Sequence, residues 1–93
     1  MTTSLAEIRA EIDRVDGALA QLIEQRLGLA EAIGRLKAET RTVEMDEARQ
    51  TEILRRLEAE FPELGPLEIE SIWRVLFSLS IARQLAIISA DPT

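Results

Sequence analysis

The sequence predicts an all-α protein, with three helices per chain and a long first helix that pairs two chains into an intertwined homodimeric bundle. Three observations predict this fold class. Apolar residues recur at alternating intervals of three and four over the first 36 residues, as in helices that pack on helices. Only three residues of the chain are aromatic, so Leu, Ile, Val and Ala must fill the core. The 93 residues form one domain, whose folded part is expected over about 5–88. The hydrophobic core of a chain of this size is thin, so oligomerisation is expected.

The first helix is expected from about Ser4 to Glu39. Ser4 and Glu7 have the spacing of a capping box. At 1.5 Å per residue the helix is about 50 Å long, which two shorter helices cannot cover within one monomer. The ten seam positions of this helix are Leu5, Ile8, Ile12, Val15, Leu19, Leu22, Arg26, Leu29, Ile33 and Leu36. The uncovered part of this seam needs a second copy of the chain.

Two shorter helices are expected after a polar loop over residues 40–46. Asp46 is a good N-cap for a helix that runs to about Glu60 and turns Ile53, Leu54 and Leu57 inward. The Pro- and Gly-containing stretch 61–66 breaks the chain. Pro66 suits the first turn of a third helix, which is expected to reach about Ser89 and leave residues 90–93 as a frayed tail.

Composition excludes several classes of function. The net charge of −6 argues against binding to nucleic acids and to anionic membrane surfaces. No apolar run approaches about 20 residues, so no bilayer span is expected, and no signal pattern opens the chain. A cytoplasmic location is therefore expected. The chain has no Cys, His or Tyr, so its chemistry must rest on Arg, Lys, carboxylates, Ser and amides, and no metal or cofactor is expected.

Arg26 is the exception on the seam, because the other nine seam positions are aliphatic. A buried charge is costly unless it is paired, so Arg26 either meets a carboxylate elsewhere in the protein or awaits an anionic ligand. Lys37 follows three helical turns later on nearly the same face, with Ala30 and Ile33 between the two cations. Such a face would form a trough for a compact dianion. Arg9 lies about 25 Å from Arg26 along the helix and could reach the same ligand only from a partner chain.

Other polar residues fall near this face when the helices are packed. Arg49 and Gln50 lie in the first turn of the second helix beside Asp46, and Ser80 and Gln84 lie one turn apart on the face of Phe77. Each residue taken alone also has a structural interpretation. Arg26 would belong to a structural ion pair, and Lys37 would be a solvated charge at a helix end. Arg49 would pair with Glu52 or Glu47 at the surface, and Asp46 would only cap its helix. Arg9 would be an exposed cation, and Ser80 and Gln84 would be polar residues on the outer face.

In combination, these residues resemble the all-helical chorismate mutase family. The segments that carry the resemblance are IRAEIDRVD (8–16), QLIEQRLGLAEAIGRLK (21–37), MDEARQTEIL (45–54) and SIARQ (80–84). They cover about residues 5–88 and keep the family's spacing. The resemblance implies an isomerase of aromatic amino acid biosynthesis, in the shikimate pathway, that rearranges chorismate to prephenate. It also implies an entwined dimer with two active sites, each using one basic residue from the opposite subunit.

The resemblance implies a role for each matching position. Arg26, together with Arg9 from the partner chain, would bind the substrate carboxylates. Lys37 would contact a carboxylate and the ether oxygen, and Gln84 would donate to that oxygen. Asp46 and Arg49 would lie near the ring and the pocket mouth, Ser80 would help hold the ring carboxylate, and the remaining lining would come from Ala30, Ile33, Phe77 and Ile81.

Gln50 departs from the family pattern, which commonly has a Glu that accepts a hydrogen bond from the C4 hydroxyl of the substrate. Gln can accept the same bond but lacks the charge. A mutase for 4-amino-4-deoxychorismate and an isochorismate-pyruvate lyase are therefore kept as alternatives. Two further alternatives are a non-catalytic helical dimerisation module and a protein that depends on a partner enzyme of the same pathway.

Overall fold

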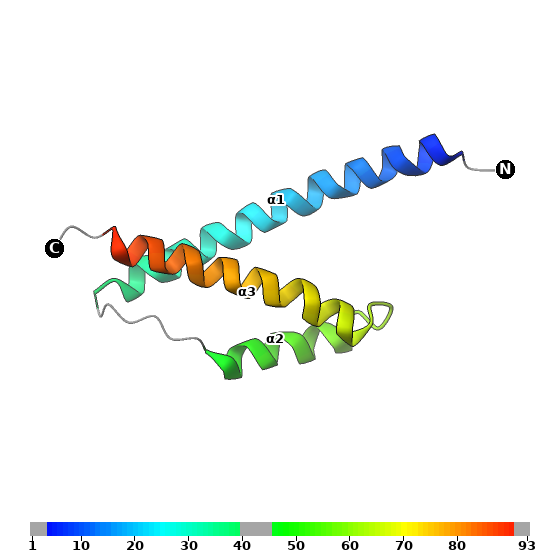
Figure 1. Cartoon of the computed structure of the whole chain (residues 1–93). Coiled ribbons are helices and arrows are strands. Elements are labelled where there is room, and N and C mark those ends of the chain that lie inside the picture. Colours follow the sequence, from blue (N-terminus) through cyan, green and yellow to red (C-terminus); the bar gives the residue numbers. More distant parts are fainter. Residues whose placement is uncertain (1–3, 40–45, 91–93) are drawn as a thin grey trace.

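The computed structural model describes residues 4–39 and 46–90, and these residues are folded into three α-helices (Figure 1). The helices are α1 (Leu5–Lys37), α2 (Glu47–Glu60) and α3 (Pro66–Ser89). The all-α fold class is confirmed, and α1 ends two residues earlier than predicted. The predicted loop over 40–45 and most of the predicted C-terminal tail, 91–93, lie outside the described residues.

The helices begin where the sequence predicts, because side chains satisfy their first free amides. The Ser4 hydroxyl accepts from the Glu7 backbone N–H at 3.1 Å, and Asp46 accepts from the Arg49 N–H at 2.9 Å. At the start of α3 the Glu68 carboxylate accepts from the Gly65 N–H at 2.8 Å, with Pro66 in the first turn. Asp46 is therefore an N-cap, as one interpretation of the sequence had it.

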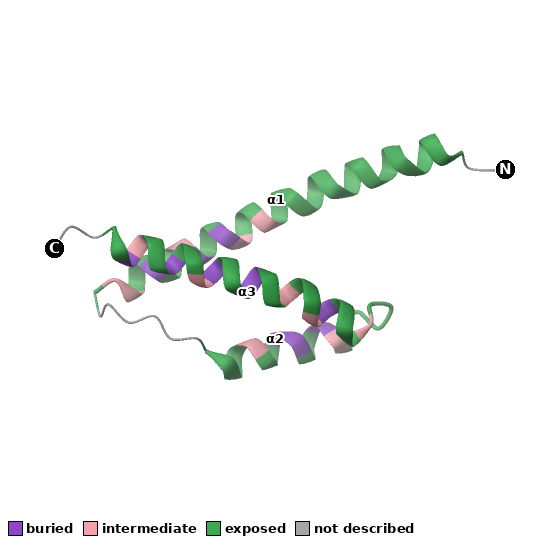
Figure 2. Cartoon of the chain, in the orientation of Figure 1, coloured by how far each residue is buried: buried purple, intermediate pink, exposed green. Residues whose placement is uncertain are grey.

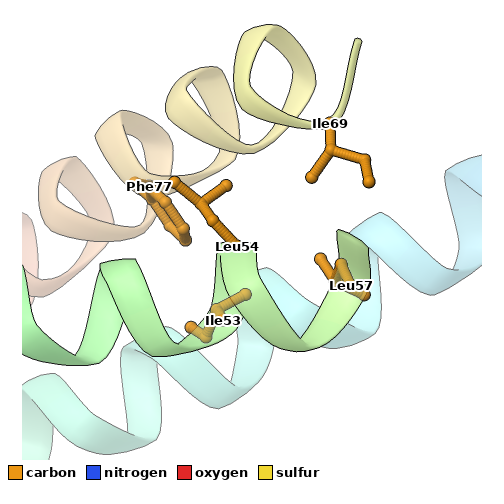
Figure 3. Packing of buried hydrophobic residues seen from close by; sticks show 5 residues of the cluster. All are labelled: Ile53, Leu54, Leu57, Ile69 and Phe77. Carbon is orange, nitrogen blue, oxygen red and sulfur yellow. The ribbon is translucent and has the colours of Figure 1, made fainter. Parts of the chain in front are cut away.

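α3 is the central element of the chain. It packs against α1 on one side and α2 on the other, whereas α1 and α2 have no direct packing contact along their lengths. Between α2 and α3 lies a cluster of buried apolar side chains, in which Leu54 lies beside Phe77 and Leu57 lies near Ile69 (Figure 3). Ile53 completes the cluster, so all three residues predicted to turn inward from the second helix do so.

α1 meets α3 through a stripe of residues displaced by one position from the predicted seam. The buried residues of α1 are Leu27, Ala30 and Gly34, whereas the seam residues Leu29 and Ile33 remain exposed. The physical reason is size, since Ala30 and Gly34 leave room for the backbone of α3 to come close. A Cβ on Gly34 would lie only 3.0 Å from the Cα of Gln84.

The aliphatic seam of α1 is uncovered along its whole length. In Figure 2 the N-terminal half of α1 is exposed on every turn and projects beyond the other two helices. The exposed apolar seam residues are Leu5, Ile8, Ile12, Val15, Leu19, Leu22, Leu29, Ile33 and Leu36. An exposed apolar surface of this extent is typical of an interaction surface.

The dimensions of the chain agree with this interpretation. Its radius of gyration is 17.2 Å, whereas a compact domain of the same length has about 12 Å. Its accessible surface is 7349 Å², against about 5,400 Å² for a globular monomer of this mass. The excess, about 2,000 Å², is of the size that an extensive interface between subunits would remove.

α3 is apolar on two faces. Besides its buried face it exposes Ile72, Val75 and Leu79, three residues at helical spacing. With 24 residues and a mean hydropathy of 1.3 in its most apolar window, α3 is long and apolar enough to cross a bilayer by length and composition. The expectation that no segment spans a bilayer was made from uninterrupted apolar runs, and Arg74 and Arg83 do interrupt the aliphatic residues of this helix without lowering its mean hydropathy below that of a candidate span. The central helix of a globular protein has the same length and composition.

Candidate functional site

A hollow of about 360 Å³ opens between α1 and α2, with α3 as its floor. It exists because α3 holds the two outer helices apart where they have no packing contact with each other. Its volume lies within the range of small-molecule sites. The lining residues are Arg26, Leu29, Ala30, Ile33 and Lys37 of α1, Asp46, Arg49, Gln50 and Ile53 at and within α2, and Phe77, Ser80, Ile81 and Gln84 of α3.

The hollow has a positive lining although the chain is acidic. Three basic side chains, Arg26, Lys37 and Arg49, face it, against one acidic side chain, Asp46. The net charge of the whole chain is −6, so the cations are concentrated here against the average composition. Aliphatic and aromatic residues make up the rest of the lining, which lowers the local dielectric and strengthens the attraction for an anion.

Arg26 meets no carboxylate among the described residues. Its Nη1 donates to the Ser80 hydroxyl at 2.7 Å, and its guanidinium lies over the Phe77 ring at 5.7 Å from the centroid. Burial lowers the pKa of the Arg26 guanidinium, and the positive charge of Arg49 lowers it further. Arginine nevertheless stays protonated in proteins, so the site carries a partly desolvated cation with no counter-ion among the residues that the structure describes. An anionic ligand would offset both the burial of the Arg26 charge and its repulsion by Arg49.

Ser80 and Gln84 are buried in the pocket wall, and the outer-face interpretation of both is wrong. They are 8% and 6% exposed, because this face of α3 turns toward α1 and the hollow. The Ser80 hydroxyl donates to the Leu76 carbonyl oxygen at 2.8 Å while it accepts from Arg26. Two hydrogen bonds thus fix the position of this hydroxyl.

Gln84 makes no side-chain hydrogen bond within the described part of the chain. Its Oε1 is fully buried without a partner. A buried polar group without a partner is costly and uncommon in folded proteins. A half-turn of the amide group exchanges Oε1 with Nε2, so the same position can present either an acceptor or a donor to a molecule in the hollow.

The α2 side of the hollow combines a cap, a cation and an amide. Arg49 forms an ion pair with the exposed Glu52, which agrees with its predicted surface interpretation, and it also lines the hollow. Gln50 is half-buried at the same wall. Lys37, the last residue of α1, is half-buried at the opposite wall.

The structure therefore brings together eleven of the twelve predicted site residues. The exception is Arg9, which lies on the exposed N-terminal half of α1 and does not line the hollow of its own chain. The sequence prediction omitted Leu29 and Ile53. Both carried a usable signal, since Leu29 is a seam residue and Ile53 was predicted to face inward. No group of three or more Asp and Glu side chains in the described ranges is placed to hold a metal ion.

Comparison with known proteins gives one match. Residues 8–85 match the family model described as chorismate mutase type II. No curated protein and no solved structure matches the chain. The matched range contains every residue of the hollow.

Proposed function

The chain belongs to the chorismate mutase type II family, and we propose that it rearranges its substrate in the hollow between α1, α2 and α3, completed by Arg9 of the partner subunit. Membership of this family makes the protein an isomerase of the aromatic amino acid pathway that converts chorismate to prephenate. The observation that carries the assignment of the site is the partly buried Arg26, which lines the hollow and meets no carboxylate in the described ranges 4–39 and 46–90.

The chemistry of the rearrangement suits the residues present. The reaction is pericyclic, so a C–C bond forms as the ether C–O bond breaks within one molecule. It requires no nucleophile and no proton transfer, in accord with a chain that has no Cys or His. The protein must hold a flexible dianion in its compact form and stabilise the negative charge that develops on the ether oxygen.

Arg26 and Lys37 have separate roles in this proposal. Arg26 and the partner subunit's Arg9 bind the two substrate carboxylates, for which the planar guanidinium is suited. Lys37 and Gln84 donate to the ether oxygen from opposite helices. The buried Oε1 of Gln84 has no hydrogen-bond partner, and a half-turn of the amide would place Nε2 in the same position, where it could donate to the ether oxygen.

Ser80 has a more limited role than a free hydroxyl would have. Its only proton is donated to the Leu76 carbonyl, and its oxygen accepts from Arg26. To donate to a substrate carboxylate, Ser80 would have to give up the bond to Leu76. With that bond intact, it acts by orienting Arg26.

A homodimer supplies what the single chain lacks. The exposed seam of α1 and the exposed residues Ile72, Val75 and Leu79 of α3 need an apolar cover. A second copy of α1 has the length and the apolar spacing to cover the seam. In an antiparallel pair, the N-terminal half of α1 of the partner subunit would run beside the hollow of the first chain. This arrangement gives a two-fold interface and brings a partner Arg9 into each site.

The shared site makes a prediction for mixed dimers. Arg9→Ala and Lys37→Ala homodimers are each expected to be nearly inactive. When the two variant chains are co-expressed, half of the dimers are mixed, and each mixed dimer has one site with both residues intact. About a quarter of wild-type activity should therefore return. Absence of recovery, with mixed dimers verified by native mass spectrometry, would place Arg9 outside the partner's site.

The reaction itself is tested by following the ultraviolet absorbance of chorismate with pure protein and identifying the product. Isochorismate and 4-amino-4-deoxychorismate are assayed beside it, which separates the mutase from the lyase and from the amino-substrate mutase. Prephenate as the main product is the expected result. Turnover that appears only when another enzyme of the same pathway is added would make that enzyme part of the functional unit.

Gln50 is proposed to face the C4 substituent of the substrate. Its neutral amide can accept from a hydroxyl but offers no charge to an ammonium group, so it favours chorismate over the 4-amino compound. Gln50→Glu is expected to raise the kcat/KM for 4-amino-4-deoxychorismate relative to chorismate about tenfold, the worth of one charge-assisted hydrogen bond. An unchanged ratio of the two specificity constants would contradict this assignment.

A further inference from the structure

At Gly34 the backbones of α1 and α3 approach closely, and Gly34 lies directly against Gln84. A Cβ on Gly34 would meet the Gln84 Cα at 3.0 Å, the Gln84 carbonyl oxygen at 3.3 Å and the Ile87 Cβ at 3.3 Å. Two of these three atoms are backbone atoms, which cannot move by a rotamer change. Gly34 is buried, whereas a Cβ on Gly17 or Gly28 would meet nothing within 4 Å in this chain.

A cross-helix ion pair holds the two helices together at the same level. Glu31 accepts from Arg83 of α3 at 2.5 Å and also pairs with Arg35 of its own helix at 3.7 Å. Arg83 directly precedes Gln84 in the chain, and Glu31 lies about one helical turn before Gly34. The pair therefore bridges α3 and α1 beside the contact of Gly34 with Gln84.

This contact controls the position of an amide that faces the hollow. The Oε1 of Gln84 is buried without a hydrogen-bond partner, so within the described residues no polar contact at that atom orients the side chain. What fixes its reach is the position of its own backbone, which lies in van der Waals contact with Gly34. Lys37 is on α1 less than one turn after Gly34, so the same contact sets the separation between Lys37 and Gln84 across the hollow.

We infer that Gly34 is a positioning residue for catalysis, because its missing side chain sets the distance at which Gln84 of α3 faces Lys37 of α1. The inference rests on the proposed function, in which these two side chains share the ether oxygen. The required spacing is fixed by close backbone packing, with the Glu31–Arg83 pair as its support. A larger residue at position 34 would displace Gln84 without touching the substrate.

Gly34→Ala is the direct test. The added methyl group is expected to push the α3 backbone outward by a few tenths of an ångström and to lower kcat about tenfold, with KM within about twofold of wild type. The matched control is Gly17→Ala, on the same helix with open space around the new Cβ, which should leave both constants unchanged. Unchanged kcat in Gly34→Ala would overturn the inference.

A double-mutant cycle distinguishes positioning from a general loss of structure. If Gly34 acts through Gln84, then Gly34→Ala should change the residual kcat of Gln84→Ala by less than about twofold, against about tenfold in the wild-type background. The same tenfold loss in both backgrounds would show a general structural effect and refute the positioning role. Circular dichroism verifies that each variant keeps its helices.

If Gly34→Ala does not fold, the ion pair decides the question. Arg83→Gln removes the support between helices, while Arg35→Gln removes the same charge from the same partner within α1 alone. The inference predicts that Arg83→Gln lowers kcat about threefold in the otherwise wild-type protein. In the Gln84→Ala background the same change should have no effect on kcat. Arg35→Gln should not lower kcat. Equal kcat in the two variants would refute it. Wild-type protein without mutase activity would refute the proposed function instead, so the two failures are distinguishable.

Discussion

Replacing Lys37 by Ala is expected to lower kcat at least about a hundredfold, because a preorganised donor to a developing oxyanion is worth about 2.7–4 kcal/mol. KM should change less, since the ammonium acts most strongly on charge that appears only in the transition state. Lys37 is the last residue of α1, where a cation interacts favourably with the helix dipole. Loss of this dipole interaction should by itself cost about 0.3–1 kcal/mol of stability.

Arg35→Ala is the matched control for the Lys37 variant. Arg35 is also a cation in the last turn of α1, but its side chain is 63% exposed and pairs with Glu31 away from the hollow. Steady-state kinetics and thermal unfolding of the two variants separate a local electrostatic effect from a change in net charge. Near-normal turnover in Lys37→Ala would remove this side chain from the mechanism.

Arg26→Leu is expected to abolish most activity while leaving the fold at least as stable as before. Loss of the guanidinium removes a ligand of a substrate carboxylate, so kcat/KM should fall by two orders of magnitude or more, the usual scale for a charged hydrogen-bonding partner. In the free protein the same guanidinium is partly buried and has no counter-ion among the described residues, and replacing such a buried charge by an aliphatic residue is often neutral or stabilising. Ser80 keeps its bond to the Leu76 carbonyl in this variant.

The opposite directions of the two effects make this variant decisive between functions. A non-catalytic dimerisation module would gain stability from Arg26→Leu and lose nothing. The mutase would gain or keep stability, as judged by chemical denaturation of the purified protein, and lose its activity. Arg56→Leu, on an exposed position of α2, is the control for removing one positive charge and should preserve kcat/KM.

Much of the fold could be predicted because its signals are local. Ser4, Asp46 and Pro66 stand at helix starts, and capping depends only on residues within one turn of each other. Arg26 was identified because a charge interrupts an aliphatic pattern. The family motifs then linked Arg26 to Ser80 and Gln84, which are 54 and 58 positions away.

The predicted seam of α1 was right as a pattern and incomplete as a packing surface. The sequence contains two overlapping stripes, one through Leu29 and Ile33 and one through Leu27, Ala30 and Gly34. Judged by hydrophobicity alone, the stripe through Leu29 and Ile33 is the stronger candidate for the packing surface. Within the chain α3 packs on the second, because small residues permit the closer approach, and the first stays exposed.

By itself the sequence determined three helices, their starting points, a cationic face on the first helix and the need for more apolar cover than one chain supplies. Those properties follow from periodicity, capping and composition, which are written along the chain. Tertiary structure decided that α3 lies between α1 and α2, that Arg26 rests on Ser80 and Phe77, and that Gly34 meets the backbone of Gln84. These contacts depend on which side chains are small enough for helices distant in sequence to approach, and local patterns do not encode that separation.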